Sequence, residues 1–265
     1  MSLWSSLSIS NHTPLTFSLV WPPDFMAKPK QIELETGDTF PILYEDRSVL
    51  AIDKPAGWML VPYSWQDTDR NLQAAITSSV AAGDFWARSR NLKFLRNIHR
   101  LDAGTTGILL MAKSPGALKT YGDLFETRQM KKSYFAIVEG VPKRKEWDCD
   151  LPLEKDEKQI GRMKVDPQNG KDAQTFFRLL ESRDGRSLVE AQPITGRTHQ
   201  IRVHLASAGH PVLGDSLYGA GSTRKLDKES LALRSIRLEY LDPFQRRKVR
   251  IEAPTSAFLE EFGFR

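Results

Sequence analysis

The sequence predicts an α+β fold built on one large, mostly antiparallel sheet with a few interspersed helices. Short apolar runs of strand length recur along most of the chain, whereas segments with helical spacing are few. In the second half, several strand-like runs follow one another with few helical segments between them. With 265 residues, 40% of them hydrophobic and 27% charged, the chain can bury a core as one large domain or as two lobes that share a core.

The elements expected in the first half follow from apolar runs and from the residues that interrupt them. Residues 48–53 form a predicted strand, which a proline and a glycine interrupt before a continuation over residues 58–61. The Ala-rich segment 72–82 is typical of a helix. The apolar run 107–112 has the length of a buried strand, and the Ser-Pro that follows it begins a helix through about residue 128.

The second half is expected to contain more strands than helices. The strands are predicted over residues 133–139, 173–180, 187–192, 231–240 and 248–252. Residues 198–208 form a predicted helix that ends at Gly209, because Ile201, Leu205 and Ala208 repeat at helical spacing. A last helical turn or two is expected over residues 256–262.

The N-terminal region differs from the rest of the chain in composition. Residues 1–30 are rich in serine, contain four prolines and lack the cationic start and apolar stretch of a signal peptide. We therefore expect residues 1–40 to form a mobile tail and lead-in, and residues 41–265 to form a single domain. Met26 is an alternative translation start.

Charge and cysteine content narrow the possible partners and compartments. The net charge of +5 favours a polyanionic partner, since lysine and arginine release counterions when they bind phosphates. Cys149 is the single cysteine, which excludes an intramolecular disulfide framework and fits a reducing, cytoplasmic location. No apolar run approaches the roughly 18 residues that a membrane span requires.

One segment, residues 97–107 (NIHRLDAGTTG), combines charged residues with a turn. His99, Arg100 and Asp102 lie within four residues, and a turn rich in glycine and threonine follows them before an apolar strand. Such a turn leaves a carboxylate free to face a substrate. From the chemistry alone, Asp102 could equally cap a turn, with Arg100 as a solvated surface charge.

The same segment resembles a motif of a known family. His99-Arg100-Leu101-Asp102 followed by Thr105-Thr106-Gly107 resembles the hallmark HRLD-x-x-T-S-G of the RluA family of pseudouridine synthases, with threonine in place of serine at 106. Further blocks match in the family's order: KPAG at 54–57, KKSY at 131–134, TGRTHQIRVH at 195–204, GHP at 209–211 and GDSLYG at 214–219. The resemblance runs from about Leu43 to Pro254.

The resemblance implies a fold, a reaction and a nucleophile. It implies the pseudouridine synthase fold, with an active-site cleft across the middle of a mixed sheet and residues 41–265 as the catalytic domain. The reaction detaches uracil from C1′ of its ribose, turns the base and rejoins it through C5, without oxidation or energy input. Asp102 is the implied nucleophile, and attack on the sugar, attack on the base and elimination all remain open routes.

Three further residues receive roles from the resemblance. Arg202 is expected to pair with Asp102 and keep it ionised, since a nearby cation favours the charged carboxylate. Tyr134 is expected to pack on the target base and to assist the late proton transfer at C5. Arg100 matches an arginine that enters the gap left by the flipped nucleotide, a role that suits its flat guanidinium.

The remaining motif residues are expected to bind RNA or to support the loops that do. With Arg100, this expected RNA-binding set consists of Lys54, His99, Thr105, Lys132, Arg197 and His199. Neither a cofactor nor a metal is expected, because the spacing of His199 and His204 does not suit a shared helical metal site and the family needs none. A phosphate-binding rim is expected from basic residues near the motifs: Arg88, Arg90, Lys93, Arg96, Arg128 and Lys131.

The expected function is isomerisation of specific uridines in a stem-loop of ribosomal or transfer RNA, by a monomer that recognises RNA through its catalytic domain. No separate N-terminal RNA-binding module is expected before Leu43. The alternatives are a catalytically silent RNA-binding or assembly factor of the same fold, and a nucleoside hydrolase, which would need a second carboxylate to activate water. Two departures from the family pattern, Pro62-Tyr63 and Leu233-Arg234, leave the choice of target open.

Overall fold

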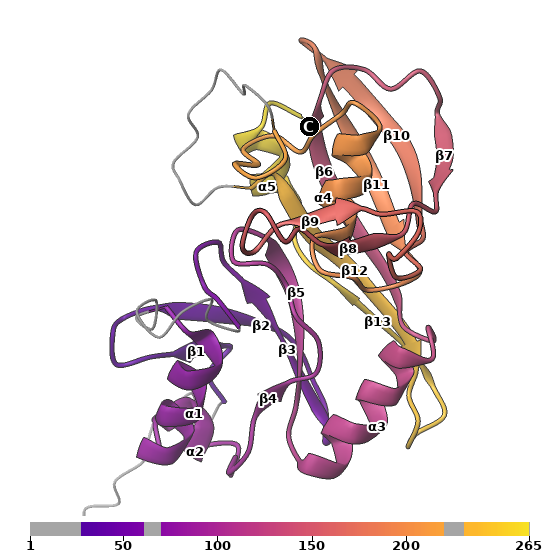
Figure 1. Cartoon of the computed structure of the whole chain (residues 1–265). Helices are drawn as coiled ribbons and strands as arrows, with labels where there is room; N and C mark the ends of the chain where they lie inside the picture. The colour runs from indigo at the N-terminus through magenta and orange to yellow at the C-terminus, as the bar shows by residue number, and fades with distance from the viewer. Residues whose placement is uncertain (1–27, 61–69, 220–230, 265) are drawn as a thin grey trace, which may run out of the picture.

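The computed structural model describes residues 28–60, 70–219 and 231–264. Its main feature is an 11-stranded sheet with the order β1-β2-β3-β5-β12-β6-β11-β10-β7, in which β4 also pairs with β5 and β13 with β12 (Figure 1). The first strands along the chain are β1 (Gln31–Glu33), β2 (Thr39–Glu45), β3 (Val49–Lys54), β4 (Arg96–Asn97), β5 (Thr106–Ala112), β6 (Lys131–Glu139) and β7 (Glu146–Cys149). The later ones are β10 (Thr175–Arg183), β11 (Arg186–Pro193), β12 (Leu233–Leu241) and β13 (Lys248–Glu252). A separate two-stranded sheet joins β8 (Leu153–Lys155) to β9 (Met163–Val165).

The sheet is mixed but mostly antiparallel, which confirms the predicted fold class. Its parallel pair, β5 with β12, joins the strands of the N-terminal half to those of the C-terminal half. Gly107 pairs with Ser235 at this junction and has a φ of 100°, a conformation that favours glycine. A Cβ atom at position 107 would lie 2.1 Å from the carbonyl oxygen of Ser235, so only glycine allows the strands to approach this closely.

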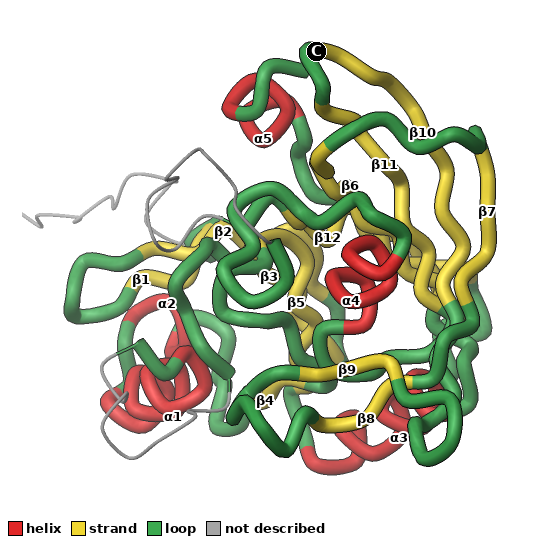
Figure 2. The backbone as a smooth tube through the Cα atoms, turned by 45° about the horizontal axis from the view of Figure 1, so that its top comes forward, coloured by secondary structure: helices red, strands yellow, loops and turns green. Residues whose placement is uncertain are grey.

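Five helices accompany the sheets in the described part of the chain: α1 (Leu72–Ala82), α2 (Phe85–Arg88), α3 (Pro115–Glu126), α4 (Gln200–Ser207) and α5 (Ser256–Glu261). Ser114 caps α3 as predicted, because its side chain accepts a hydrogen bond from the Ala117 amide. The α4 helix lies within the curve formed by β6, β11, β10 and β7 (Figure 2). None of the described helices is long and apolar enough to cross a membrane.

Both faces of the central strands are buried, which explains their continuous apolar runs. In β3, Leu50 and Ile52 join a core that includes residues of α1, α2, α4 and α5, whereas Val49 and Ala51 join a second core that includes residues of α3 and β13. The residues of β5 alternate between the same two cores. The central sheet is therefore a rigid layer covered on both sides, on which the neighbouring loops are anchored.

The predicted domain boundary at residue 41 is wrong. The hairpin of β1 and β2 begins ten residues earlier, and Ile32 and Phe40 are fully buried in the core. The apolar residues of β1 are too few and too widely spaced to stand out in the sequence, which is why this segment was assigned to a lead-in. The remainder of the predicted tail, residues 1–27, lies outside the described residues.

Several other expectations differ from the structure at short elements. The strand expected over residues 58–61 is a single bridge between Met59 and Asn71, and residue 61 lies outside the described part of the chain. The short strands β7, β8 and β9 were not predicted, nor was α2. In contrast, the bounds of α1 and β13 agree with the sequence prediction.

Candidate active site

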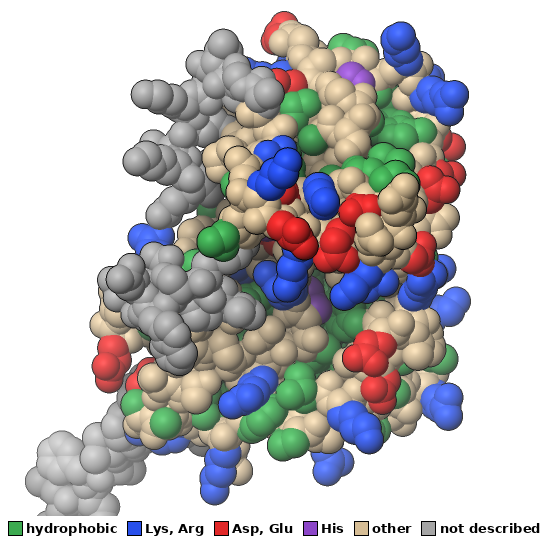
Figure 3. Space-filling model, viewed as in Figure 1, with side chains coloured by type: hydrophobic (Ala, Val, Ile, Leu, Met, Phe, Trp, Pro, Cys, Tyr) green, Lys and Arg blue, Asp and Glu red, His purple; other side chains and the backbone are tan. Residues whose placement is uncertain are grey.

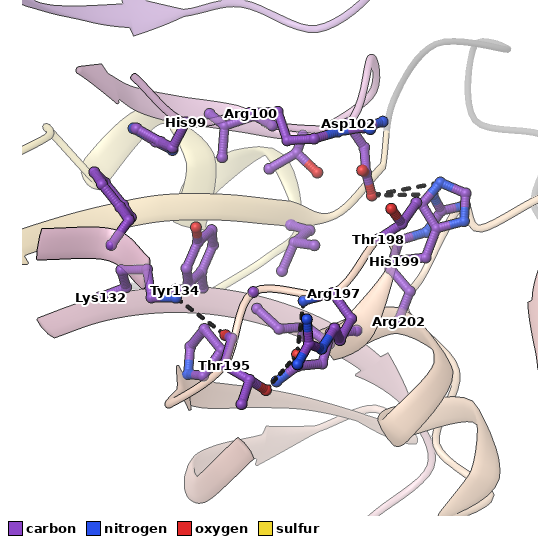
Figure 4. A pocket seen from close by; sticks show the side chains of 18 of the residues that line it. His99, Arg100, Asp102, Lys132, Tyr134, Thr195, Arg197, Thr198, His199 and Arg202 are labelled. Atoms are coloured by element: carbon purple, nitrogen blue, oxygen red, sulfur yellow. Dashed lines mark hydrogen bonds and ion pairs between the residues drawn. The ribbon is translucent and has the colours of Figure 1, made fainter. Parts of the chain in front are cut away.

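A cavity of about 400 Å³ lies between the loop before β5, the start of β6 and the segment that leads into α4. It brings together nine of the ten residues that the sequence assigned to the site: His99, Arg100, Asp102, Thr105, Lys132, Tyr134, Arg197, His199 and Arg202. Figure 4 shows that the loop residues form one wall, and that Lys132 and Tyr134 lie opposite them. Lysine and arginine side chains gather across the middle of this face of the molecule (Figure 3).

Asp102 lies in the loop before β5, with its carboxylate directed toward α4 (Figure 4). The loop turns tightly because the Thr105 amide donates a hydrogen bond to the Asp102 carbonyl at 3.1 Å. The carboxylate Oδ2 accepts a hydrogen bond from Arg202 Nη1 at 3.2 Å, and the Asp102 side chain is 16% exposed. The predicted pairing of these two residues is therefore present, and the carboxylate remains open to the cavity.

Arg202 is held more firmly by a second carboxylate, that of Asp215. Its Nε and Nη2 donate to the two oxygens of Asp215 at 2.7 and 2.8 Å, and both residues are buried. Although burial alone would lower it, these bonds and the charge of Asp102 raise the pKa of Arg202 above its ordinary value. Asp215 Oδ1 also accepts hydrogen bonds from the amides of Leu217 and Tyr218. The bidentate pair fixes the guanidinium, so that Nη1 is aimed at Asp102.

His199 lies directly before α4 and faces the same carboxylate. It has a φ of 55°, a left-handed conformation that is uncommon for a residue with a side chain. Its Nε2 lies 3.8 Å from Asp102 Oδ2, and its Nδ1 lies 2.8 Å from the hydroxyl of Tyr218. Burial lowers the pKa of His199, more than the charge of Asp102 raises it, so the imidazole is neutral at pH 7.

Two residues of β6 form the opposite wall of the cavity. Tyr134 is 8% exposed, and burial raises the pKa of its phenol to about 12, so it keeps its proton at neutral pH. Lys132 Nζ donates to the carbonyl of Thr195 at 3.0 Å, and burial lowers its pKa to about 8. The wall therefore offers a protonated phenol and a lysine that is largely engaged with the protein itself.

The loop before α4 is organised by Gln200. Its amide oxygen accepts hydrogen bonds from the Thr195 hydroxyl and the Arg197 amide, and its amide nitrogen donates to the Gln174 carbonyl and the Thr175 hydroxyl. Arg197 is exposed at the rim, where its Nε donates to the carbonyl of Asp172. These bonds fix the loop that carries Arg197.

Lys54 and Thr105 do not occupy the surface positions that RNA contact requires. Lys54 is fully buried, and its ammonium donates to four backbone carbonyls, those of Pro55, Asp102, Ala103 and Thr105. Burial lowers its pKa to about 7, against the opposing effect of Asp102. Lys54 therefore holds the loop of Asp102 from below, and its assignment to RNA binding is wrong. Thr105 lines the cavity but is only 2% exposed.

His99 supports the same loop from the other side. Its Nε2 accepts the Leu110 amide of β5 at 3.0 Å, its ring stacks on Phe125 of α3 at 4.7 Å, and burial lowers its pKa to about 3. Arg100, the next residue, is exposed at the rim of the cavity. His99 is thus a neutral scaffold residue, and Arg100 is free to meet a ligand.

The predicted basic rim is only partly present. Arg128 lines the cavity and forms an exposed ion pair with Asp172 at 2.7 Å. The side chain of Arg90 is only 3% exposed and pairs with Glu45 at 2.9 Å, with further bonds to the carbonyls of Pro29 and Trp86. Arg90 is therefore not part of the rim, because these partners satisfy its charge and tie Pro29 to α2.

The departures from the family pattern have different consequences. Leu233 lines the cavity, whereas Arg234 pairs with Asp53 of β3 at 2.6 Å and donates to the Pro254 carbonyl. Arg234 thus ties β12 to β3 instead of facing the cavity. Thr106, in place of serine, has a buried hydroxyl without a hydrogen-bond partner among the described residues. Pro62-Tyr63 lies outside the described part of the chain.

Asp215 and Tyr218 are site residues for which the sequence analysis gave no role. Both belong to the block GDSLYG, which was matched to the family without a function. The signal available was an aspartate and a tyrosine between two glycines, the first of them three residues after the GHP block. Their contact with Arg202 and His199 depends on the tertiary fold and is not readable from spacing.

The arrangement suits chemistry with a single reactive carboxylate. Asp102 opens to the cavity, while Asp215 is 2% exposed and engaged by Arg202 and two amides, so it is not positioned to activate water. No cluster of three histidine, cysteine or acidic residues suited to a metal occurs among residues 28–60, 70–219 and 231–264. His204, for example, bonds to Thr175 and to the Leu151 carbonyl.

Comparison with known proteins gives the same result as the geometry. The family model described as RNA pseudouridylate synthase matches residues 48–207. Ribosomal large subunit pseudouridine synthase C of Vibrio cholerae is 35% identical over 229 residues, 83% of this chain and 67% of that protein. Dual-specificity RNA pseudouridine synthase RluA of Escherichia coli is 33% identical over 186 residues, 70% of this chain and 80% of that protein. The solved structure of human RNA pseudouridylate synthase domain containing 4 matches with a TM-score of 0.64 at 26% identity, over 84% of this chain and 91% of that one.

The fold and the matches define a pseudouridine synthase, an isomerase that modifies RNA. The chain belongs to the RluA family of these enzymes, since the family model spans more than half of it and relatives of this family match most of its length.

Proposed function

We propose that the protein isomerises specific uridines in structured ribosomal or transfer RNA, with Asp102 as the nucleophile. The observation that carries this proposal is the set of contacts around Asp102. Its carboxylate opens to a cavity, faces a guanidinium that Asp215 fixes, and lies in a loop that the buried Lys54 ammonium holds from below. A carboxylate so aimed can begin bond exchange at a bound nucleotide.

The other cavity residues support the steps that follow. The N-glycosidic bond of the uridine breaks, the base turns within the pocket and a bond forms between C1′ and C5, after which the hydrogen at C5 is lost to solvent. Tyr134 keeps its proton and lies in the wall opposite the loop of Asp102, where it can pack on the base and assist the proton transfer at C5. Arg100, exposed at the rim, can occupy the gap that the flipped nucleotide leaves.

The substrate class follows from charge and from the relatives. The exposed Arg100, Arg128 and Arg197 surround the opening of the cavity, as binding to a phosphate backbone requires. The relatives are named for ribosomal RNA and for dual specificity, so a stem-loop of either RNA class is the proposed target. We further propose that the protein acts as a monomer in the cytoplasm.

The decisive experiment measures tritium release from total RNA labelled with [5-³H]uridine in cells that lack this gene. The wild-type protein should release tritium without freeing uracil, whereas a hydrolase would free uracil and a silent RNA-binding factor would do neither. Asp102→Asn should lower the rate by about 10⁴-fold or more while RNA binding remains. Asp148→Asn, an exposed aspartate on β7, is the matched control and should release tritium at the wild-type rate.

An unchanged rate in a folded, RNA-bound Asp102→Asn protein would exclude Asp102 as the nucleophile. The target itself would be identified by mapping pseudouridines in RNA from cells with and without the gene. Sites that disappear with the gene and return with the wild-type protein, but not with Asp102→Asn, are its products.

A further inference from the structure

The hydroxyl of Tyr218 links the reactive site to a separate hairpin. Its oxygen accepts the amide hydrogen of Met163, at the start of β9, with a separation of 2.8 Å. The same oxygen lies 2.8 Å from Nδ1 of His199. The Tyr218 ring also lies beneath the guanidinium of Arg202, with 5.1 Å between the guanidinium carbon and the ring centre. Three contacts therefore hold this phenol in one orientation.

These contacts determine where the hydrogen atoms lie. The Met163 amide can only donate, and within the described residues His199 Nδ1 is the other polar atom bonded to the phenol oxygen. Burial raises the pKa of Tyr218 to about 12, so the phenol keeps its hydrogen and donates it to Nδ1. A neutral imidazole that accepts at Nδ1 carries its own hydrogen on Nε2, the atom that lies 3.8 Å from Asp102 Oδ2.

We propose that Tyr218 holds His199 as its Nε2–H tautomer and thereby aims a second hydrogen-bond donor, beside Arg202, at the carboxylate of Asp102. The proposal rests on the proposed function of Asp102, and it makes His199 and Tyr218 positioning residues. The left-handed turn at His199, with a φ of 55°, supports it because such strain persists where the surrounding structure requires it. At 3.8 Å the contact is longer than a hydrogen bond, and such contacts commonly tighten when substrate binds.

Removing the phenol hydroxyl should allow the wrong tautomer. In Tyr218→Phe, neutral His199 can carry its hydrogen on Nδ1, which turns the Nε2 lone pair toward the Asp102 carboxylate. Protonation of His199 would restore the Nε2–H, so the defect should be greatest at high pH and smaller at low pH. The charged groups that face the imidazole are Asp102 and Asp215, which favour protonation, and Arg202 and Arg100, which oppose it.

The first test is nitrogen-15 NMR of the histidine rings in the RNA-free protein, which reports the tautomer without any activity. The resonances of His199 would be assigned by their loss in His199→Gln. We expect the Nε2–H pattern in the wild type and its loss or mixing with the Nδ1–H pattern in Tyr218→Phe. Tyr240→Phe is the matched control, because Tyr240 is a buried tyrosine whose hydroxyl has no partner among the described residues. An Nδ1–H pattern in the wild type would overturn the proposal.

The second test follows kcat and KM for tritium release from pH 8 down to the lowest pH at which the protein stays folded. Tyr218→Phe should lower kcat at pH 7 to 8, where His199 is neutral, on the order of 10-fold to 100-fold with little change in KM, and the defect should shrink only below the lowered pKa of His199. In His199→Gln the amide group can donate a hydrogen bond near the Nε2 position without help from Tyr218. This variant should therefore retain more activity than His199→Leu. Adding Tyr218→Phe to it should cause no further loss. The proposal would be overturned by a loss of kcat that stays equal down to pH values at which NMR shows His199 protonated. It would also be overturned by a loss that adds fully to that of His199→Gln, since either result would reduce Tyr218 to a structural residue. If the wild type released no tritium, the proposed function would fail, while the NMR result would still decide the tautomer.

Discussion

Arg202 serves two carboxylates in unequal ways. Asp215 receives two short bonds from it and two more from backbone amides, whereas Asp102 receives a single bond of 3.2 Å. Arg202 is therefore compensated by Asp215 even when Asp102 turns toward a substrate. A buried arginine with one partner would instead resist the loss of that partner, because an uncompensated buried charge is costly. The second carboxylate thus leaves the first free to react.

Lys54 provides a prediction about pH and stability. Its pKa is lowered to about 7 by burial, whereas the unfolded chain should show an ordinary lysine value near 10.4. Between these values the unfolded state binds a proton that the folded state does not, so this group makes the free energy of unfolding rise as pH rises from about 7 to about 10. In Lys54→Met this contribution should disappear, as measured by urea unfolding across that range.

The control for this measurement is Lys119→Met, which removes an exposed lysine from α3. Its unfolding free energy should follow the wild-type pH dependence. The free energy of unfolding of Lys54→Met could instead change with pH in parallel with that of the wild type. This result would show that Lys54 remains charged in the folded protein.

The pairing of Asp102 with Arg202 could be predicted from the sequence, but the residues that support this pair could not. Asp102 and Arg202 lie in motifs whose residue types and order indicate the chemistry, and the structure brings them together. Lys54 was assigned to RNA binding because it lies in the KPAG block that resembles a family motif, and this resemblance does not reveal whether the side chain is buried. Its burial follows from the loop of Asp102 packing above it, a contact between residues 48 or more positions apart. Asp215 was missed for the same reason.

At the scale of elements, apolar runs and capping residues predicted the central strands and longer helices well. The apolar run of β5 is continuous because both faces are buried, and α3 begins where Ser114 and Pro115 require it. The strands β7, β8 and β9 have three or four residues each and are mostly polar or half-buried. Their pairing depends on neighbouring strands more than on their own composition, so a sequence pattern could not reveal them.

The hairpin of β1 and β2 gives the second prediction. Ile32 is fully buried in β1, between Gln31 and Glu33, which are exposed. Ile32→Ala should lower the free energy of unfolding by about 2–5 kcal/mol, since it removes buried methyl groups and leaves a cavity. Chemical denaturation would measure this effect, with Gln31→Ala as the matched control within the same strand. Equal stability of the two variants would mean that β1 is not part of the cooperative fold.

At the scale of the whole molecule, the site lies where the two halves of the sheet meet. The loop of Asp102 leads into β5, and Tyr134 lies on β6, with β12 between these strands in the sheet. Gly107 allows β5 and β12 to approach closely, and Arg234 on β12 reaches Asp53 on β3. Residues from distant parts of the sequence are therefore held in register by the most buried part of the sheet. Displacement of one half relative to the other would separate Asp102 from Tyr134.

The charge distribution around the cavity gives the third prediction. Arg100 and Arg197 are exposed at its rim, so each is expected to contact an RNA phosphate and to release a counterion on binding. The logarithm of the RNA-binding constant should fall linearly with the logarithm of salt concentration, and Arg100→Gln and Arg197→Gln should each reduce the slope by roughly 0.7. Arg250→Gln is the control, because this exposed arginine lies on β13 beside Glu252 and outside the cavity lining. If all three variants kept the wild-type slope, RNA would have to approach by another face. A reduced slope for Arg100→Gln and Arg197→Gln alone would instead locate the phosphate path at the opening above Asp102.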